Sequence, residues 1–214
     1  MVGSGYIDFA GRVLAMTRPG DPRMPNGVEA AVRPELGVPA RIGRGRLLVG
    51  ELEVIPGAAW EPIPVVRHLP AGGPSLRPDP DRLAGRGPGL TPAGDDILCG
   101  YVAGLFLFHG RREEASAIAQ RAAGLTTRLS ATLLRHAAVG ELPEPAHAYL
   151  AEGDTGPLAA FGHSSGRCLL LGLAMAAASP SGPPVGLEAL LTLAGIELPS
   201  RKGVVPIAIG GPPA

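Results

Sequence analysis

Residues 85–96 combine a glycine-rich loop, the expected start of a helix and two neighbouring carboxylates. Their sequence is Gly-Arg-Gly-Pro-Gly-Leu-Thr-Pro-Ala-Gly-Asp-Asp. Glycines permit positive φ angles and let a backbone approach a ligand closely, whereas Pro88 and Pro92 stiffen the path between them. Thr91 followed by Pro92 is typical of an N-cap and the first residue of a helix. We therefore expect free backbone N–H groups at this helix start, an arrangement that binds anions.

Asp95 and Asp96 fall in the first turn of this expected helix. Carboxylates there stabilise the helix dipole, which is a sufficient structural reason for at least one of them. They would also repel a bound phosphate or carboxylate unless a cation lay between them. The chemical hypothesis is a metal-assisted anion site in which Asp95 and Asp96 are ligands of an ion such as Mg²⁺, with no organic cofactor. The loop residues expected to hold the anion are Gly87, Gly89, Thr91 and Gly94.

A second glycine-bounded loop, Gly162-His163-Ser164-Ser165-Gly166, precedes another apolar segment at residues 167–178. Either serine is suited to cap a helix. If the two apolar helices pack side by side with their N-termini together, both loops border one cleft. His163 would then be placed to move a proton near neutral pH, although a histidine beside serines is also a common hydrogen-bonded loop residue. The catalytic candidates are His163, Asp95 and Asp96, and the second loop adds Ser164, Ser165 and Gly166 as substrate contacts.

The part of the chain before these motifs has the features of β-structure. Short apolar runs at residues 13–16, 47–49 and 52–55 are separated by glycine and proline. Such runs predict strands of a small antiparallel sheet or an open barrel. Prolines between residues 62 and 80 then predict an irregular connection. We therefore place a β-rich N-terminal region at residues 1–80.

Residues 81–198 are expected to be mainly helical and to carry both glycine motifs. Residues 97–108 are almost all apolar, which predicts a buried helix, and Gly100 and Gly104 would let a neighbouring helix pack closely. The second buried helix is the segment after Gly166. The fold class is therefore α+β, with two buried helices that each follow a glycine-rich loop.

Two further segments complete this region and the chain. Apolar residues recur at spacings of three and four between residues 113 and 139, which predicts one amphipathic helix with a bend at Gly124. A short helix is expected at residues 187–193. Residues 199–214 are rich in proline and glycine and are expected to form a loose C-terminal tail.

The composition argues against several classes of partner. The chain of 214 residues has 19 basic and 19 acidic residues, so no overall field attracts nucleic acid or an anionic membrane. The longest apolar segments are about a dozen residues, whereas a membrane-spanning helix needs roughly 20. Cys99 and Cys168 are isolated within apolar runs, which indicates buried thiols in a reducing compartment. With no signal-peptide pattern at the N-terminus, we expect a cytoplasmic protein.

The two glycine motifs in this order, with Thr127, Ser130 and Gly140 between them, resemble the AllH-like family over roughly residues 40–178. The resemblance implies a subunit of an oxamate carbamoyltransferase of allantoin breakdown, an enzyme that moves a carbamoyl group between phosphate and the nitrogen of oxamate. It implies small anionic substrates, carbamoyl phosphate and an oxamate-like acid, and as partners other subunits or further copies of this chain. Ala93 stands where a serine is common in this family, and Cys168 stands where the family often has an aspartate.

Two other functions stay open at this point. A non-catalytic assembly subunit fits the apolar helices and the charged fraction of 18%. A metal-assisted enzyme that binds a phosphate ester or a nucleotide fits the glycine loops at helix starts. The sequence has no Gly-Lys-Ser/Thr phosphate-binding loop, which argues against the nucleotide alternative.

Overall fold

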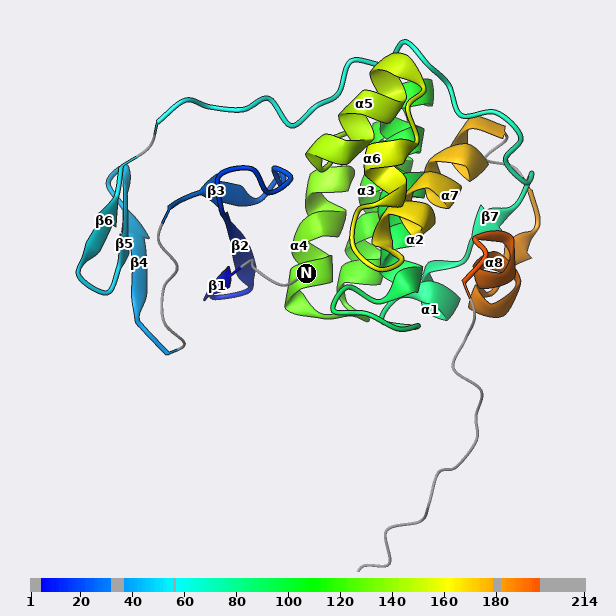
Figure 1. The fold of residues 1–214 in the computed structure, drawn as a ribbon. Coiled ribbons are helices and arrows are strands. Elements are labelled where there is room, and N and C mark those ends of the chain that lie inside the picture. The colour runs from blue at the N-terminus through cyan, green and yellow to red at the C-terminus, as the bar shows by residue number, and fades with distance from the viewer. Residues whose placement is uncertain (1–4, 32–36, 56, 179–181, 197–214) are drawn as a thin grey trace, which may run out of the picture.

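Two small sheets lie to one side of a bundle of helices in the computed structural model of the chain (Figure 1). The structure describes residues 5–31, 37–55, 57–178 and 182–196. The α+β class is confirmed, since strands occupy the N-terminal part and helices follow from residue 80 onward. The expected loose tail at residues 199–214 lies outside the described residues, and the division of the chain into regions at residue 80 stays a prediction.

The first sheet has the order β1-β2-β3 and the second the order β4-β5-β6. Pairing is antiparallel throughout except that β2 and β3 run parallel. The described strands form separate sheets rather than an open barrel, and the tight turns at residues 44–45 and 50–51 join the strands of the second sheet. The strands are β1 (Gly5–Phe9), β2 (Arg12–Thr17), β3 (Gly27–Glu29), β4 (Ala40–Gly43), β5 (Arg46–Val49) and β6 (Leu52–Val54).

The helices begin after a short parallel pair of strands, β7 (Arg77–Pro78) with β8 (Pro184–Val185), that joins distant parts of the chain. They are α1 (Pro80–Leu83), α2 (Ala93–His109), α3 (Arg112–Ala123), α4 (Arg128–Ala137), α5 (Glu144–Glu152), α6 (Gly156–Ala159), α7 (Ser165–Ala178) and α8 (Leu187–Leu193). The helix expected at residues 187–193 is α8.

The single bent helix expected over residues 113–139 is wrong, because two helices occupy that stretch. α3 ends at Ala123, and α4 begins four residues after Gly124. Thr127 has an extended backbone, and its hydroxyl accepts a hydrogen bond from the Ser130 N–H at 3.2 Å. A side-chain cap of this kind starts a new helix, so the apolar spacing continues across a break in the backbone.

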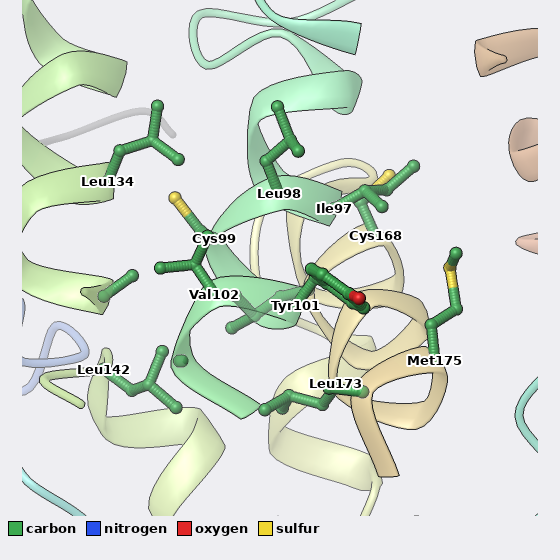
Figure 2. Packing of buried hydrophobic residues seen from close by; sticks show 14 of the residues in the cluster. Ile97, Leu98, Cys99, Tyr101, Val102, Leu134, Leu142, Cys168, Leu173 and Met175 are labelled. Carbon is green, nitrogen blue, oxygen red and sulfur yellow. The ribbon is translucent and has the colours of Figure 1, made fainter. Parts of the chain in front are cut away.

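α2 is enclosed by its neighbours, and every residue from Ala93 to Leu105 is buried. Its apolar side chains lie between Leu134 of α4 on one side and Leu173 and Met175 of α7 on the other (Figure 2). A helix that is apolar around its whole circumference belongs in a core, as the sequence predicts. Among the described residues, no helix is long and apolar enough to cross a membrane.

α2 and α7 run in parallel with their backbones in direct contact. A Cβ atom added at Gly100 would lie 2.1 Å from the carbonyl oxygen of Leu169, and one added at Gly172 would lie 2.1 Å from that of Ile97. Each helix therefore presents a glycine to a main-chain carbonyl of the other, and only glycine permits this separation. The condition set out from the sequence, that two buried helices pack side by side with their N-termini together, is met in the structure.

The N-terminal strands and the proline-rich connection are fastened to the helical part by hydrogen bonds. In β2, the N–H of Val13 donates to the Thr132 hydroxyl of α4 at 3.1 Å. Residues 57–76 pass over the bundle near α5 (Figure 1), and there the N–H of His68 donates to the Leu150 carbonyl at 2.8 Å. The first bond holds β2 against α4, and the second holds the connection against α5.

We expect Gly100→Ala to destabilise the fold by about 3 kcal/mol, because the new methyl group collides with backbone that cannot move without separating α2 from α7. The measurement is urea unfolding followed by circular dichroism. Gly124→Ala is the matched control: its added Cβ would have no neighbour closer than 3.7 Å, so we expect a change within about 1 kcal/mol. Equal effects of the two substitutions would contradict the close backbone packing of α2 on α7.

Candidate functional site

A cluster of three polar side chains lies where α2 and α7 begin. The Thr91 hydroxyl donates to Oδ2 of Asp96 at 3.2 Å and lies 3.3 Å from the Ser165 hydroxyl. Ser165 is also hydrogen-bonded to the Asp96 carboxyl group. Asp96 retains only 7% of its exposure. The parallel packing of the two helices thus brings together residues 74 positions apart around one buried carboxyl group.

Burial raises the pKa of Asp96 to about 7. Removal of water disfavours the charged form, the hydrogen bonds from Ser165 and Thr91 oppose that effect, and the neighbouring charge of Asp95 adds to it. A carboxyl group with this pKa is present in both protonation states near neutral pH. It can therefore accept and release a proton, as general acid–base chemistry requires.

The charge of Asp96 raises the pKa values of three other titratable side chains, two thiols and one phenol. Burial raises the pKa values of the Cys99 and Cys168 thiols, the latter to about 12, and the charge of Asp96 adds to both shifts. Both cysteines are free and buried, as the sequence predicts, and both are protonated at neutral pH. The pKa of Tyr6 in β1 is raised by burial and by Asp96 as well, which places the first strand within electrostatic reach of the site.

Asp95 has a different environment from Asp96. Its Oδ1 accepts the Gly85 N–H at 2.8 Å, its Oδ2 accepts the Thr126 hydroxyl, and the residue is 1% exposed. The carboxylate thus joins the glycine loop and the turn between α3 and α4 to the start of α2. These bonds give a structural reason for Asp95, and its role as catalyst or metal ligand stays a prediction.

The expectation of free N–H groups at the start of α2 is wrong, because the preceding loop folds back and satisfies them. The N–H of Ala93 donates to the Pro88 carbonyl at 3.2 Å, and the N–H of Gly94 donates to the Arg86 carbonyl at 2.9 Å. The N–H groups of Asp95 and Asp96 both donate to the Pro92 carbonyl. Thr91 is not the N-cap either. The helix begins at Ala93 after Pro92, and the Thr91 hydroxyl is directed to Asp96 instead.

The glycines of both motifs have packing or backbone reasons in this structure. Gly87 and Gly89 have φ angles of 99° and 113°, which other residues rarely adopt. A Cβ atom at Gly94 would lie 2.1 Å from the Leu83 carbonyl oxygen, and one at Gly166 would lie 1.6 Å from that of Leu158. Contact of these glycines with a substrate stays a prediction.

The second loop places its three polar residues differently. His163 is exposed, and its carbonyl accepts from the Arg167 side chain at 3.5 Å. Ser164 is buried, and its carbonyl accepts the Cys168 N–H at 3.0 Å in the first turn of α7. Among the interactions of the described residues, none joins the His163 imidazole to Asp96. Ser165 is therefore the member of this loop that the structure brings to Asp96.

A cavity of about 40 Å³ opens beside Asp96, between α2, α4, α7 and the loop before β3. Its walls are mostly apolar and include Cys99, Leu133 and Leu169. Asp96, Glu141 and Ser165 supply the charged and hydroxyl groups. A small, mostly apolar recess with a few convergent polar groups is typical of a ligand site.

Glu141 is a cavity residue that the sequence motifs did not indicate. Its Oε2 pairs with Nδ1 of His136, and its N–H donates to the His136 carbonyl at 3.0 Å. These contacts hold the carboxylate in the segment between α4 and α5. In the sequence Glu141 follows Gly140, where the pattern indicates only the end of a helix, so no local signal would have identified it.

The donor set does not suit a Mg²⁺ ion. Mg²⁺ requires octahedral oxygen ligands, whereas both oxygens of Asp95 already accept hydrogen bonds. No group of three histidine, cysteine or acidic side chains that could hold a metal occurs in the part of the chain that the structure describes. The magnesium site stays an untested expectation, and the acid–base chemistry of Asp96 does not depend on it.

Comparison with known proteins finds a family whose model matches the part of the chain that contains this site. A family model described as oxamate carbamoyltransferase subunit AllH matches residues 83–177, a little under half of the chain. The matched segment contains both glycine motifs, Asp96 and Glu141, and the predicted resemblance is confirmed over it. No curated protein and no solved structure matches the chain.

We expect Asp95→Asn and Asp96→Asn to change the free energy of unfolding in opposite directions at pH 8. Asp95→Asn places an amide NH₂ opposite one of the two donors, the Gly85 N–H or the Thr126 hydroxyl, and is expected to destabilise by about 2 kcal/mol. The folded-state pKa of Asp96 is raised from 3.8, so its ionisation lowers stability as pH rises from about 4 to about 7. Asp96→Asn is therefore expected to be more stable than the native chain at pH 8, on the order of a few kcal/mol.

Urea unfolding at pH 5 and pH 8 tests this comparison. At pH 5 Asp96 is protonated in the folded chain but mostly ionised in the unfolded chain, so the advantage of Asp96→Asn over the native chain is expected to be present but clearly smaller than at pH 8. Glu113→Gln, which removes an exposed carboxylate in the first turn of α3, is the control. A native chain whose stability does not decline between pH 5 and pH 8 relative to Asp96→Asn would contradict the raised pKa.

Proposed function

From the match of residues 83–177 to the AllH family, we propose that this chain is a subunit of an oxamate carbamoyltransferase-type enzyme. The enzyme would move a carbamoyl group between carbamoyl phosphate and a small amide or carboxylate acceptor in the catabolism of purine nitrogen from allantoin. We further propose that the cavity at Asp96 is the place where the chain acts on the acceptor. Its partners would be other subunits of the enzyme or further copies of the chain.

The observation that carries this proposal is the state of Asp96. Its carboxyl group is buried, held by the hydroxyls of Thr91 and Ser165, exposed to a small cavity, and has a pKa of about 7. A carboxylate that served only to stabilise the helix dipole would need neither burial nor two hydroxyl partners. Perturbed acidity beside a cavity is typical of a group that handles protons during catalysis.

Carbamoyl transfer needs such a group at the attacking nitrogen. The amide nitrogen of oxamate forms a bond to the carbonyl carbon of carbamoyl phosphate, and the bond from that carbon to the phosphate oxygen breaks. Inorganic phosphate leaves with the electron pair, and the attacking nitrogen loses one proton. In the proposal the Asp96 carboxylate accepts that proton, and the hydroxyls of Thr91 and Ser165 hold its oxygens in place.

His163 is the second candidate for proton transfer in this proposal. It lies between Phe161 and Ser165, both of which line the cavity, so its loop borders the site. Because the side chain is exposed, it would act on a group of the substrate that extends out of the cavity. Asp95 would contribute by keeping the glycine loop in position rather than by contact with substrate.

A non-catalytic assembly subunit is the second candidate function, and exposed apolar residues on and beside the second sheet favour it. Ile42 is 64% exposed, Leu52 is 50% exposed, and Ile55 is 80% exposed. Apolar side chains gathered on one small sheet are a common feature of protein–protein contacts. A phosphate or nucleotide enzyme has no such support, because the N–H groups at the start of α2 are already bonded.

We expect Asp96→Asn to lower the rate of carbamoyl transfer to oxamate by about 10²- to 10⁴-fold in the complex purified with its partner subunits. Asparagine keeps the size and one acceptor oxygen of the side chain but takes up no proton. Glu113→Gln, at an exposed position of α3 that does not line the cavity, is the control for loss of a carboxylate. Full turnover by the Asp96→Asn complex would assign the chemistry to another subunit and favour the assembly function.

A further inference from the structure

We propose that the cavity at Asp96 is a subsite for a primary amide group, –C(=O)NH₂, and that it excludes the phosphate and carboxylate groups of the substrates. The inference rests on the proposed function and deepens it, because it divides the substrate between this cavity and groups outside it. It also replaces the expectation of an anion site at the glycine loop.

The polar groups of the cavity suit N–H donors. Asp96 and Glu141 line the cavity, and carboxyl oxygens accept hydrogen bonds. The Ser165 hydroxyl donates to Asp96 and can still accept a hydrogen bond through its oxygen. An amide NH₂ has two donors, which two carboxyl groups can accept. Its carbonyl oxygen needs one donor, which the protonated form of Asp96 supplies.

The same groups disfavour an anion. None of the lining residues is lysine, arginine or histidine, so within the described residues the cavity offers no cation to a phosphate or a carboxylate. Two basic side chains of neighbouring segments have other partners: His136 pairs with Glu141, and Arg167 donates to the carbonyls of Gly195 and His163. An anion in this poorly hydrated recess would have no cation among the lining residues to compensate its lost hydration, and the ionised form of Asp96 would repel it.

The size of the cavity agrees with this chemistry. A bound water needs roughly 10–15 Å³ of such space, so about 40 Å³ holds three or four atoms of that size. An amide group has three non-hydrogen atoms, whereas phosphate has five. Leu133 and Leu169 in the walls would also keep water from an attacking nitrogen.

The anionic end of each substrate must then be held outside this cavity. The N–H groups at the start of α2 already donate to the loop carbonyls of Pro88 and Arg86, so they are not available to bind the anionic end. In a multi-subunit enzyme the phosphate would be held at the mouth of the cavity or by a partner subunit. The cavity of this chain would select the amide.

The test is calorimetric titration of the full chain with four probes: oxamate, oxalate, carbamoyl phosphate and inorganic phosphate. Oxalate has the shape of oxamate but carries a carboxylate in place of the amide, and phosphate lacks the carbamoyl group. We expect oxamate to bind at least about tenfold more tightly than oxalate. The second carboxylate of oxalate has no N–H group to donate, so it would leave the buried acceptors of the cavity unpaired. A preference for carbamoyl phosphate over phosphate instead would identify the carbamoyl NH₂ as the bound amide and would equally support the subsite.

Two substitutions show whether the preference arises in the cavity. Glu141→Gln is expected to reduce the preference for the amide about tenfold, because its new NH₂ faces the ligand NH₂. Glu144→Gln, which removes a carboxylate three residues away that accepts from the Arg23 N–H, is the matched control and is expected to leave the preference in place. Both variants are first compared with the native chain by circular dichroism and thermal unfolding.

Oxalate or phosphate binding as tightly as its amide counterpart would overturn the subsite, as would binding of none of the four probes or an unchanged preference in Glu141→Gln. These results are separable from failure of the proposed function. Loss of turnover in Asp96→Asn together with equal binding of oxamate and oxalate would retain the function and overturn the subsite. Full turnover in Asp96→Asn together with a strong preference for the amide would overturn the proposed function of Asp96 and retain the subsite.

Discussion

The direct backbone contact between α2 and α7 is the constraint on which the rest of this structure depends. Gly100 and Gly172 each meet a carbonyl group of the opposite helix, at a separation that leaves no room for a side chain. Because the two helices run parallel at this distance, their first turns and preceding loops must also meet. The position of Asp96 beside Thr91 and Ser165 follows from this contact, and so does the burial that raises its pKa.

The glycine loops then serve the helices rather than a ligand directly. The loop before α2 returns to bond the helix N–H groups, and Asp95 fixes it through Gly85 and Thr126. With the backbone donors occupied, the chemistry that remains is that of one buried carboxyl group and a small recess.

The sequence predicts much of the scaffold because apolar spacing and glycine position are local properties. The burial of α2, its close neighbour, the strands β5 and β6 and the helix α8 are confirmed. The errors arise where one side-chain hydrogen bond decides where a helix begins. Thr127 caps a new helix, and the Thr91 hydroxyl donates to Asp96 instead of capping α2. Glu141 and Tyr6 reach the site only through tertiary packing, which one sequence does not encode in any short pattern.

The proposed chemistry depends most on one property, that Asp96 holds a proton near neutral pH inside this cavity. The most direct measurement is a titration of the aspartate side-chain carbons by ¹³C NMR in the labelled full chain, with Asp96→Asn used to assign the resonance. We expect one carboxyl resonance with a midpoint near pH 7 that is absent from the Asp96→Asn spectrum. A midpoint near the ordinary value of 3.8 for Asp96 would contradict the proposed role, because the carboxyl group would then be charged throughout the neutral range.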